Sequence, residues 1–120
     1  MSRPRSTWSL ETATEVVPGG VVVSARGRVS SGTAGAFAAA LTTACAGTGR
    51  VVIDLTGVDY MSGPGIVALR DAGAAGVGRV IICGLQEAVR ITLELAGLLD
   101  GTVQVEATTE AALARLPLEK

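Results

Sequence analysis

The sequence predicts an α/β fold in which a mixed five-stranded sheet is combined with about four helices. Two early segments of alternating polarity surround a tight turn, which predicts an antiparallel hairpin. After the hairpin, short apolar runs alternate with segments of helical periodicity, which is typical of parallel strands joined by crossover helices. The chain has 120 residues, 48% of them hydrophobic, with one Trp, one Tyr and one Phe. We therefore expect one domain with a core of small aliphatic side chains.

The predicted hairpin comes first in the chain. Loose alternation over Trp8–Val17 and regular alternation over Val21–Val29 predict its two strands. The segment Pro18-Gly19-Gly20 between them is a turn signal, because proline fixes φ and glycine allows positive φ. Residues 1–7 are polar and are expected to be disordered, so the single domain is predicted to span residues 8–117.

The rest of the chain alternates between helix and strand. Helical spacing of apolar residues predicts four helices, and short apolar runs predict three further strands. The predicted helices are Thr33–Ala46, Pro64–Gly76, Gln86–Ala96 and Thr109–Leu116. The predicted strands are Arg50–Leu55, Arg79–Gly84 and a segment near Thr102–Val105. The segment Thr56–Ser62 is predicted as the turn that joins a strand to a helix.

The composition excludes several kinds of chemistry. The chain has no histidine, which excludes Ser-His-Asp and Cys-His catalysis and zinc sites that need imidazole. A net charge of −1 and few aromatic residues argue against nucleic-acid binding, which uses basic surfaces and stacking side chains. We therefore expect a protein without catalytic activity, metal or cofactor.

Three sequence features suggest the cytoplasm as the compartment. No apolar segment follows the basic N-terminus, so no signal peptide is expected. The uncharged segment Val29–Gly49 is long enough to span a bilayer, but its many Ser, Thr and Gly residues favour a loop and a half-buried helix. Cys45 and Cys83 have no C-x-x-C spacing and are predicted to be buried free thiols, which suits a reducing compartment.

The most unusual segment lies between the third predicted strand and the second predicted helix. Ser62 suits the N-cap of that helix, and Pro64 suits its first turn. Ser62 is also a candidate phosphorylation site or partner contact, because a helix N-terminus tolerates a dianion. Asp54 is expected to accept hydrogen bonds from neighbouring backbone N–H groups. With Asp59 it forms the only candidate acidic pair, which is too few ligands for a divalent metal.

The segment Gly63–Ala68 matches G-x-G-x-x-A, a dinucleotide-binding pattern, and Glu87 follows at a compatible distance. A dinucleotide site needs its glycines directly after the strand, whereas here Thr56–Ser62 are expected to intervene. The chain is also too short for two mononucleotide-binding halves. We therefore do not expect nucleotide binding.

Several segments together resemble the STAS domain family, the anti-sigma-factor antagonists of bacteria. The matching segments are Asp54–Ile66, Val80–Leu85, Val89-Arg90, Leu93–Leu98, Glu110–Leu113 and Gly27. The resemblance covers roughly residues 8–116 and depends on the order and spacing of these motifs.

The resemblance implies a mixed sheet with helices mainly on one side, and no catalysis. It implies a binding module, monomeric or weakly dimeric, that docks on an ATP-dependent serine-kinase anti-sigma factor and displaces its sigma factor. In the family, the kinase reverses docking by phosphorylating a serine at the N-terminus of the second helix. The partner-binding residues it implies here are Asp54, Tyr60, Met61, Ser62, Gly63, Pro64 and Gly65.

One departure from the family pattern concerns this switch. The phosphorylated serine of the family aligns with Gly63, which has no hydroxyl. Either Ser62 replaces it one residue earlier, or the domain is not regulated by phosphate. Ser30 stands where the family has an acidic residue after the second strand. The alternative function is that of a scaffold subunit in a stress-sensing complex or a small partner of a lipid-transporting ABC ATPase.

Overall fold

The computed structural model describes residues 10–47, 49–76, 79–99 and 103–114. Its strands are β1 (Leu10–Val17), β2 (Gly20–Val29), β3 (Arg50–Met61), β4 (Val80–Cys83) and β5 (Gln104–Glu106). Its helices are α1 (Ala34–Cys45), α2 (Gly63–Ala75), α3 (Glu87–Leu95) and α4 (Thr109–Leu113). The order of elements is the predicted one. The predicted disorder of residues 1–7, and the predictions for Trp8 and Leu116, lie outside the described residues.

The sheet is mixed, as predicted, with the strand order β1-β2-β3-β4-β5. The strands β1 and β2 pair antiparallel, and every other neighbouring pair is parallel. The hairpin closes through Pro18 and Gly19, and Gly19 has a φ of 89°, a value that glycine adopts without steric cost. The two edges differ, because β1 has eight residues and β5 has three.

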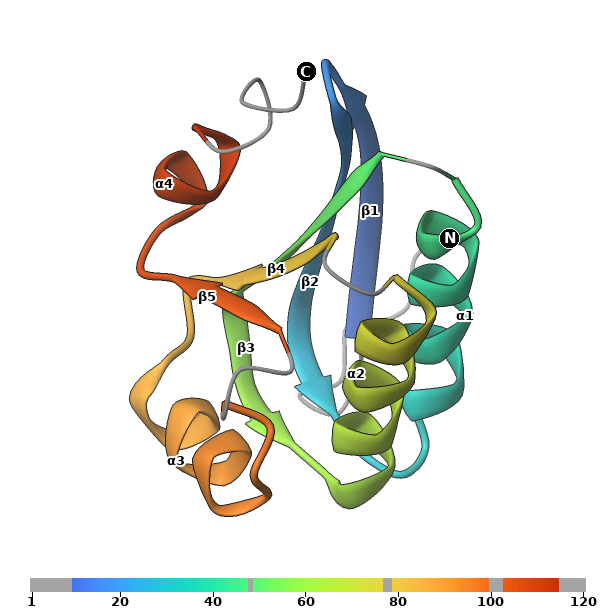
Figure 1. Cartoon of the computed structure of the whole chain (residues 1–120). Coiled ribbons are helices and arrows are strands. Elements are labelled where there is room, and N and C mark those ends of the chain that lie inside the picture. Colours follow the sequence, from blue (N-terminus) through green and yellow to red (C-terminus); the bar gives the residue numbers. More distant parts are fainter. Residues whose placement is uncertain (1–9, 48, 77–78, 100–102, 115–120) are drawn as a thin grey trace, which may run out of the picture.

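Three helices cover one face of the sheet and α4 covers part of the other (Figure 1). The main core lies between the sheet and α1, α2 and α3. Its largest fully buried side chains are Phe37, Leu41, Ile53, Leu55, Leu69, Ile82, Leu93 and Leu98. A smaller cluster packs under α4 and contains Val22, Val52, Ile81, Cys83 and Ala112. Each large aliphatic side chain buried in this way contributes about 1.5–3 kcal/mol to stability.

The strand β3 is longer than predicted, which corrects the expected turn at Thr56–Ser62. Residues up to Met61 pair with β2, and only Ser62 separates β3 from α2. The pairing register shifts between Ser24 and Arg26 and again between Gly27 and Arg28. Each shift places an extra residue in β3, as a β-bulge does. The buried positions Leu55, Val58 and Met61 are therefore three residues apart, and the alternation of a regular strand is lost.

The cysteine prediction is confirmed, since Cys45 and Cys83 are free and buried. Burial raises the pKa of both thiols above the ordinary value. Within the described ranges, no helix combines the length and the hydrophobicity needed to cross a membrane.

Candidate functional site

The N-terminus of α2 follows directly on the end of β3, and Ser62 forms the junction. The Ser62 hydroxyl accepts a hydrogen bond from the Gly65 backbone N–H at 3.4 Å, and its carbonyl accepts one from the Ile66 N–H at 3.0 Å. Pro64 lies in the first turn, where its missing N–H costs no helical hydrogen bond. The predicted N-cap is confirmed, and such a cap contributes about 1 kcal/mol.

The start of α1 lies beside this junction. The Ser62 N–H donates to the Val29 carbonyl at 2.7 Å, which ties the end of β3 to the end of β2. The Thr33 hydroxyl donates to the Arg28 carbonyl at 2.7 Å and accepts from the Ser30 N–H at 2.8 Å. These bonds fix the turn that leads into α1. The helices α1 and α2 therefore both begin at one end of the molecule (Figure 1).

Two glycines in the first turn of α2 differ in the space around them. A Cβ atom on Gly65 would lie 2.5 Å from the Met61 sulfur and 2.6 Å from Val29 Cγ1, so α2 approaches the sheet only because this residue is glycine. A Cβ atom on Gly63 would meet no atom within 4 Å. The φ of Gly63 is also not positive. The space beyond the chain neighbours therefore does not require glycine at position 63, although the following Pro64 disfavours helical backbone in any other residue there.

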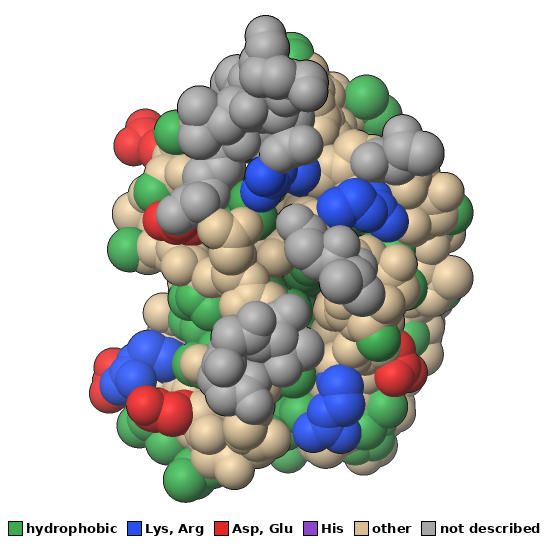
Figure 2. Space-filling model, in the orientation of Figure 1, with side chains coloured by type: hydrophobic (Ala, Val, Ile, Leu, Met, Phe, Trp, Pro, Cys, Tyr) green, Lys and Arg blue, Asp and Glu red, His purple; other side chains and the backbone are tan. Residues whose placement is uncertain are grey.

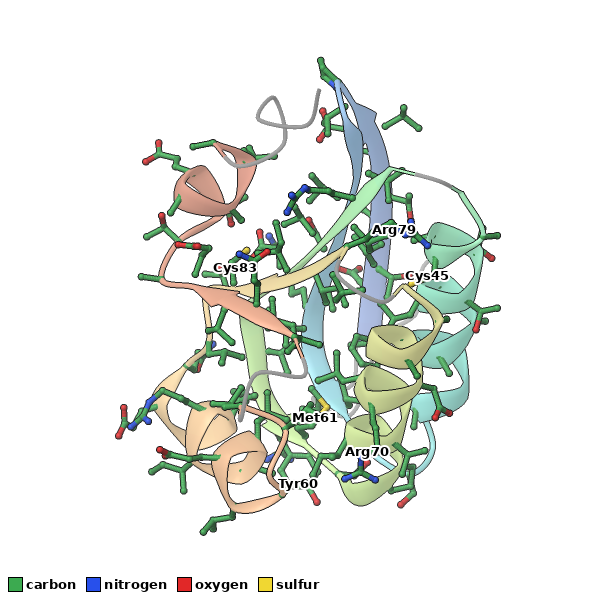
Figure 3. All side chains as sticks on the ribbon, in the orientation of Figure 1. Cys45, Tyr60, Met61, Arg70, Arg79 and Cys83 are labelled. Carbon is green, nitrogen blue, oxygen red and sulfur yellow. The ribbon has the colours of Figure 1, made fainter. Side chains whose placement is uncertain are left out.

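Tyr60 carries the exposed aromatic ring of this end. Its side chain is 43% exposed, and the Arg28 guanidinium lies 5.1 Å from its ring centroid. The Arg28 Nε atom also lies 3.6 Å from the Asp59 carboxylate. The Asp59 carboxylate restricts the Arg28 side chain, and the cation–π contact between Arg28 and Tyr60 orients the ring. Figure 3 shows Tyr60 and Met61 at the end of the molecule where α2 begins.

The outer face of α2 continues this surface. Gly63, Val67 and Arg70 follow the i, i+4, i+7 spacing that places side chains on one face of a helix. All three are exposed, and Val67 is 48% exposed despite its apolar side chain. We call the surface formed by Arg28, Tyr60, Gly63, Pro64 and Val67 the α2-start surface.

Of the partner-binding residues predicted from the sequence, only some reach this surface. Tyr60, Gly63 and Pro64 are exposed there. Met61, Ser62 and Gly65 are buried and hold the junction in shape. The sequence analysis did not single out Arg28 or Val67. The helical spacing from Gly63 was a signal for Val67, whereas Arg28 depends on a strand pairing that the sequence alone did not reveal.

Asp54 belongs to a different part of the molecule. It lines a groove of about 780 Å³ on the α4 face of the sheet, together with Ser24, Arg26, Thr56 and Thr109. The Asp54 carboxylate accepts hydrogen bonds from the Thr56 N–H at 3.0 Å and the Thr56 hydroxyl at 2.6 Å. The structure thus confirms its predicted backbone hydrogen bond.

The surroundings of Asp54 set its ionisation. Burial by itself raises the pKa of the carboxyl, but hydrogen bonds from Thr56 and from the Thr109 hydroxyl outweigh it. The net pKa is therefore lower than usual, and Asp54 is a carboxylate near neutral pH. These hydrogen bonds stabilise the charged form of Asp54, so its carboxylate suits a structural role and not that of a proton donor.

Other kinds of site find little support among the described residues. No three His, Cys, Asp or Glu side chains lie close enough together there to hold a metal ion. Figure 2 shows one face on which basic and acidic side chains form small separate groups, without a continuous basic surface among the described cations. One reason given above against a dinucleotide site was wrong, because Ser62 alone separates β3 from Gly63. Gly65 instead allows close packing against Met61 and Val29.

Comparisons with known proteins identify the family. A family model of the STAS domain matches residues 11–112, which is most of the chain. The chain belongs to the STAS domain family. Among curated proteins, none matches it by sequence.

Solved structures of STAS proteins resemble the chain along nearly its whole length. An anti-sigma factor antagonist from Mycobacterium paratuberculosis is 27% identical with a TM-score of 0.82, covering 98% of this chain and 99% of that one. The anti-sigma factor antagonist SpoIIAA in its unphosphorylated form is 21% identical with a TM-score of 0.74, covering 92% and 99%. The Bacillus cell fate determinant SpoIIAA in its phosphorylated form is 20% identical with a TM-score of 0.66, covering 88% and 98%. The SpoIIAA structures support the STAS fold alone.

Proposed function

We propose that this STAS domain is a non-enzymatic anti-sigma-factor antagonist of the cytoplasm. It binds a serine-kinase-type anti-sigma factor and thereby frees a sigma factor. The similarity to the antagonist from Mycobacterium paratuberculosis, which extends over 98% of the chain, supports this role. Antagonists of this family are generally not enzymes, and the absence of histidine agrees with that.

The observation that carries the proposal is the α2-start surface. It combines an oriented, exposed aromatic ring with exposed small residues and an exposed valine. Aromatic residues and arginine are enriched among the residues that dominate binding energy at protein interfaces. Gly63 and Pro64 leave the helix start without bulky side chains, so a partner can approach the backbone closely. The surface therefore suits a protein partner.

We further propose that docking is not switched by phosphorylation of this chain. Gly63 has no hydroxyl, and Ser62, one residue earlier, is only 7% exposed. The Ser62 hydroxyl also caps α2, so a kinase would have to break the cap to reach it. A phosphate on the buried Ser62 side chain would bring almost two negative charges into the junction. The α2-start surface would thus stay competent for docking.

A binding experiment tests the proposed role. The purified chain is immobilised and titrated with each kinase-type anti-sigma factor encoded in the same genome, and affinity is measured by biolayer interferometry. We expect at least one to bind, and we expect Tyr60→Ala to weaken binding about tenfold or more. Val105→Ala is the matched control, because Val105 is 42% exposed but lies on β5. It should bind like the wild type.

The same experiment separates the alternatives. If no kinase-type anti-sigma factor binds the wild-type chain, the antagonist role is wrong. Capture of an ABC-transporter ATPase or of a large stress-sensing assembly by the same immobilised chain would instead support the transporter or scaffold role. If an anti-sigma factor binds but Tyr60→Ala and Val105→Ala behave alike, the role stands and the α2-start surface is not the contact.

A further inference from the structure

The strand β1 forms a long edge of the sheet, and its charged residues are Glu11 and Glu15. Within the part of the chain that the structure describes, it pairs only with β2, over eight residues and without a register shift. It contains no proline and no lysine, and its six central residues, Glu11 to Val16, are all exposed. Helix α1 approaches the strand and Leu10 packs against the main core, but the side chains of the six central residues remain exposed on both faces. Natural proteins commonly guard such edges with bulges, prolines, short strands or charged side chains, and of these β1 has only the charges of Glu11 and Glu15.

We propose that β1 is a dimerisation edge, at which two copies of this chain pair β1 with β1 and form one continuous sheet. The opposite edge, β5, has three residues, so pairing of β1 with β5 would be short. A symmetric β1–β1 contact uses the same surface on both copies and closes after two subunits. It leaves no exposed long edge that could pair further.

The hairpin determines which backbone groups of β1 face the free edge. Val17 and Gly20 flank a two-residue turn and pair directly. In an antiparallel ladder, hydrogen-bonded and non-hydrogen-bonded pairs alternate, and the pair that flanks such a turn is hydrogen-bonded. Odd-numbered residues of β1 therefore bond to β2. The even-numbered residues Thr12, Thr14 and Val16 direct their N–H and C=O groups to the free edge.

Charge then selects the register of the dimer. In a dimer related by a two-fold axis perpendicular to the sheet, even-numbered residues pair with even-numbered residues and odd-numbered with odd-numbered ones. The axis therefore passes between the two copies of one β1 residue, and that residue defines the register. An axis at Ala13 would place Glu11 opposite Glu15 of the second copy, and like charges directly opposite are destabilising. An axis at Thr14 places Thr12 opposite Val16 and Glu15 opposite Ala13. The Thr14 register therefore avoids the repulsion and covers Val16, which is 82% exposed.

Sedimentation equilibrium of the full chain tests the dimer. We expect a monomer–dimer equilibrium within a concentration series from about 1 µM to 1 mM. Val16→Lys places a charge on the edge and should raise the dimer dissociation constant at least about tenfold, which is about 1.4 kcal/mol. Leu95→Lys is the matched control, because Leu95 is 84% exposed but lies on α3. It should dimerise like the wild type.

A cross-linking experiment tests the register. In the Thr14 register, the two Thr14 Cα atoms lie about 5.5 Å apart, within the range of a disulfide. The two Ala13 Cα atoms then lie about 8 Å apart, which is too far. With oxidised glutathione, Thr14→Cys should form a covalent dimer much faster than Ala13→Cys. A monomeric wild type at every concentration would refute the proposal, as would a dimer unaffected by Val16→Lys or a faster cross-link at position 13.

Discussion

Replacing Gly65 by alanine tests the packing that holds the start of α2 against the sheet. The added Cβ atom would lie 2.5 Å from the Met61 sulfur and 2.6 Å from Val29 Cγ1. The Met61 side chain is flexible, but Val29 is β-branched and fully buried, so the helix or β2 has to move. Overpacking of this kind costs about 1–3 kcal/mol, and alanine returns about 0.5–1 kcal/mol through helix propensity. We expect a net loss of about 1–2 kcal/mol.

Gly63→Ala is the matched control, two residues away in the same helix. A Cβ atom there meets no atom within 4 Å beyond its chain neighbours and its own helix backbone, and the helix-propensity gain of alanine is opposed by the following Pro64, so we expect a change of less than about 0.5 kcal/mol. Urea unfolding followed by far-UV circular dichroism measures both variants. At about 4 °C per kcal/mol, Gly65→Ala should also lower Tm by about 4–8 °C. If Gly65→Ala is as stable as the wild type, or if Gly63→Ala loses more stability, the proposed packing at Gly65 is wrong.

The remaining predictions concern the cap, the switch and the groove. Ser62→Ala should lose about 1 kcal/mol of unfolding free energy by removal of the N-cap, whereas Ser62→Asp should retain most of it. Gly63→Ser should fold normally and become a substrate of a kinase-type anti-sigma factor with ATP, whereas mass spectrometry of the wild type should detect no phosphate. The lowered pKa of Asp54 stabilises the fold above about pH 4, and this contribution is lost as acid protonates the carboxylate. The free energy of unfolding of the wild type should therefore exceed that of Asp54→Asn by less as pH falls below about 4. Urea titrations at pH 7 and pH 3 measure this difference, and a difference that stays constant would contradict the prediction.

Most of the fold could be predicted from the sequence because its elements follow regular periods. The hairpin was marked by Pro18 and Gly19, and α1, α2 and α3 by apolar residues at helical spacing. The second half of β3 could not be predicted in this way. Its two bulges place the buried residues Leu55, Val58 and Met61 at intervals of three, which matches neither a strand nor a helix.

The error in β3 also explains why the candidate site was predicted only in part. Asp54 and Met61 are close in sequence, and both were predicted to contact the partner. In the structure they lie seven positions apart along β3, which is about 23 Å at about 3.3 Å per residue for a regular strand. The bulges also decide that Tyr60 is exposed while Met61 is buried. These details depend on how β3 pairs with β2, and the sequence of one strand does not reveal that pairing.

The missing hydroxyl at Gly63 affects the proposed phosphorylation switch but leaves the proposed docking surface intact. The φ there is not positive, and a Cβ atom would meet no atom within 4 Å beyond its chain neighbours and its own helix backbone, so the space around position 63 can hold serine. The proposed loss of the switch is thus a matter of one side chain, and the proposed docking surface does not depend on it. Ser62 offers no substitute, because its hydroxyl is buried and engaged in the cap. If the chain acts as an antagonist, release must therefore come from the partner's own nucleotide state or from competition for the chain. A kinase-type partner that binds wild type and Gly63→Ser equally without ATP, but releases only Gly63→Ser when ATP is added, would show that the switch was lost and the interface kept.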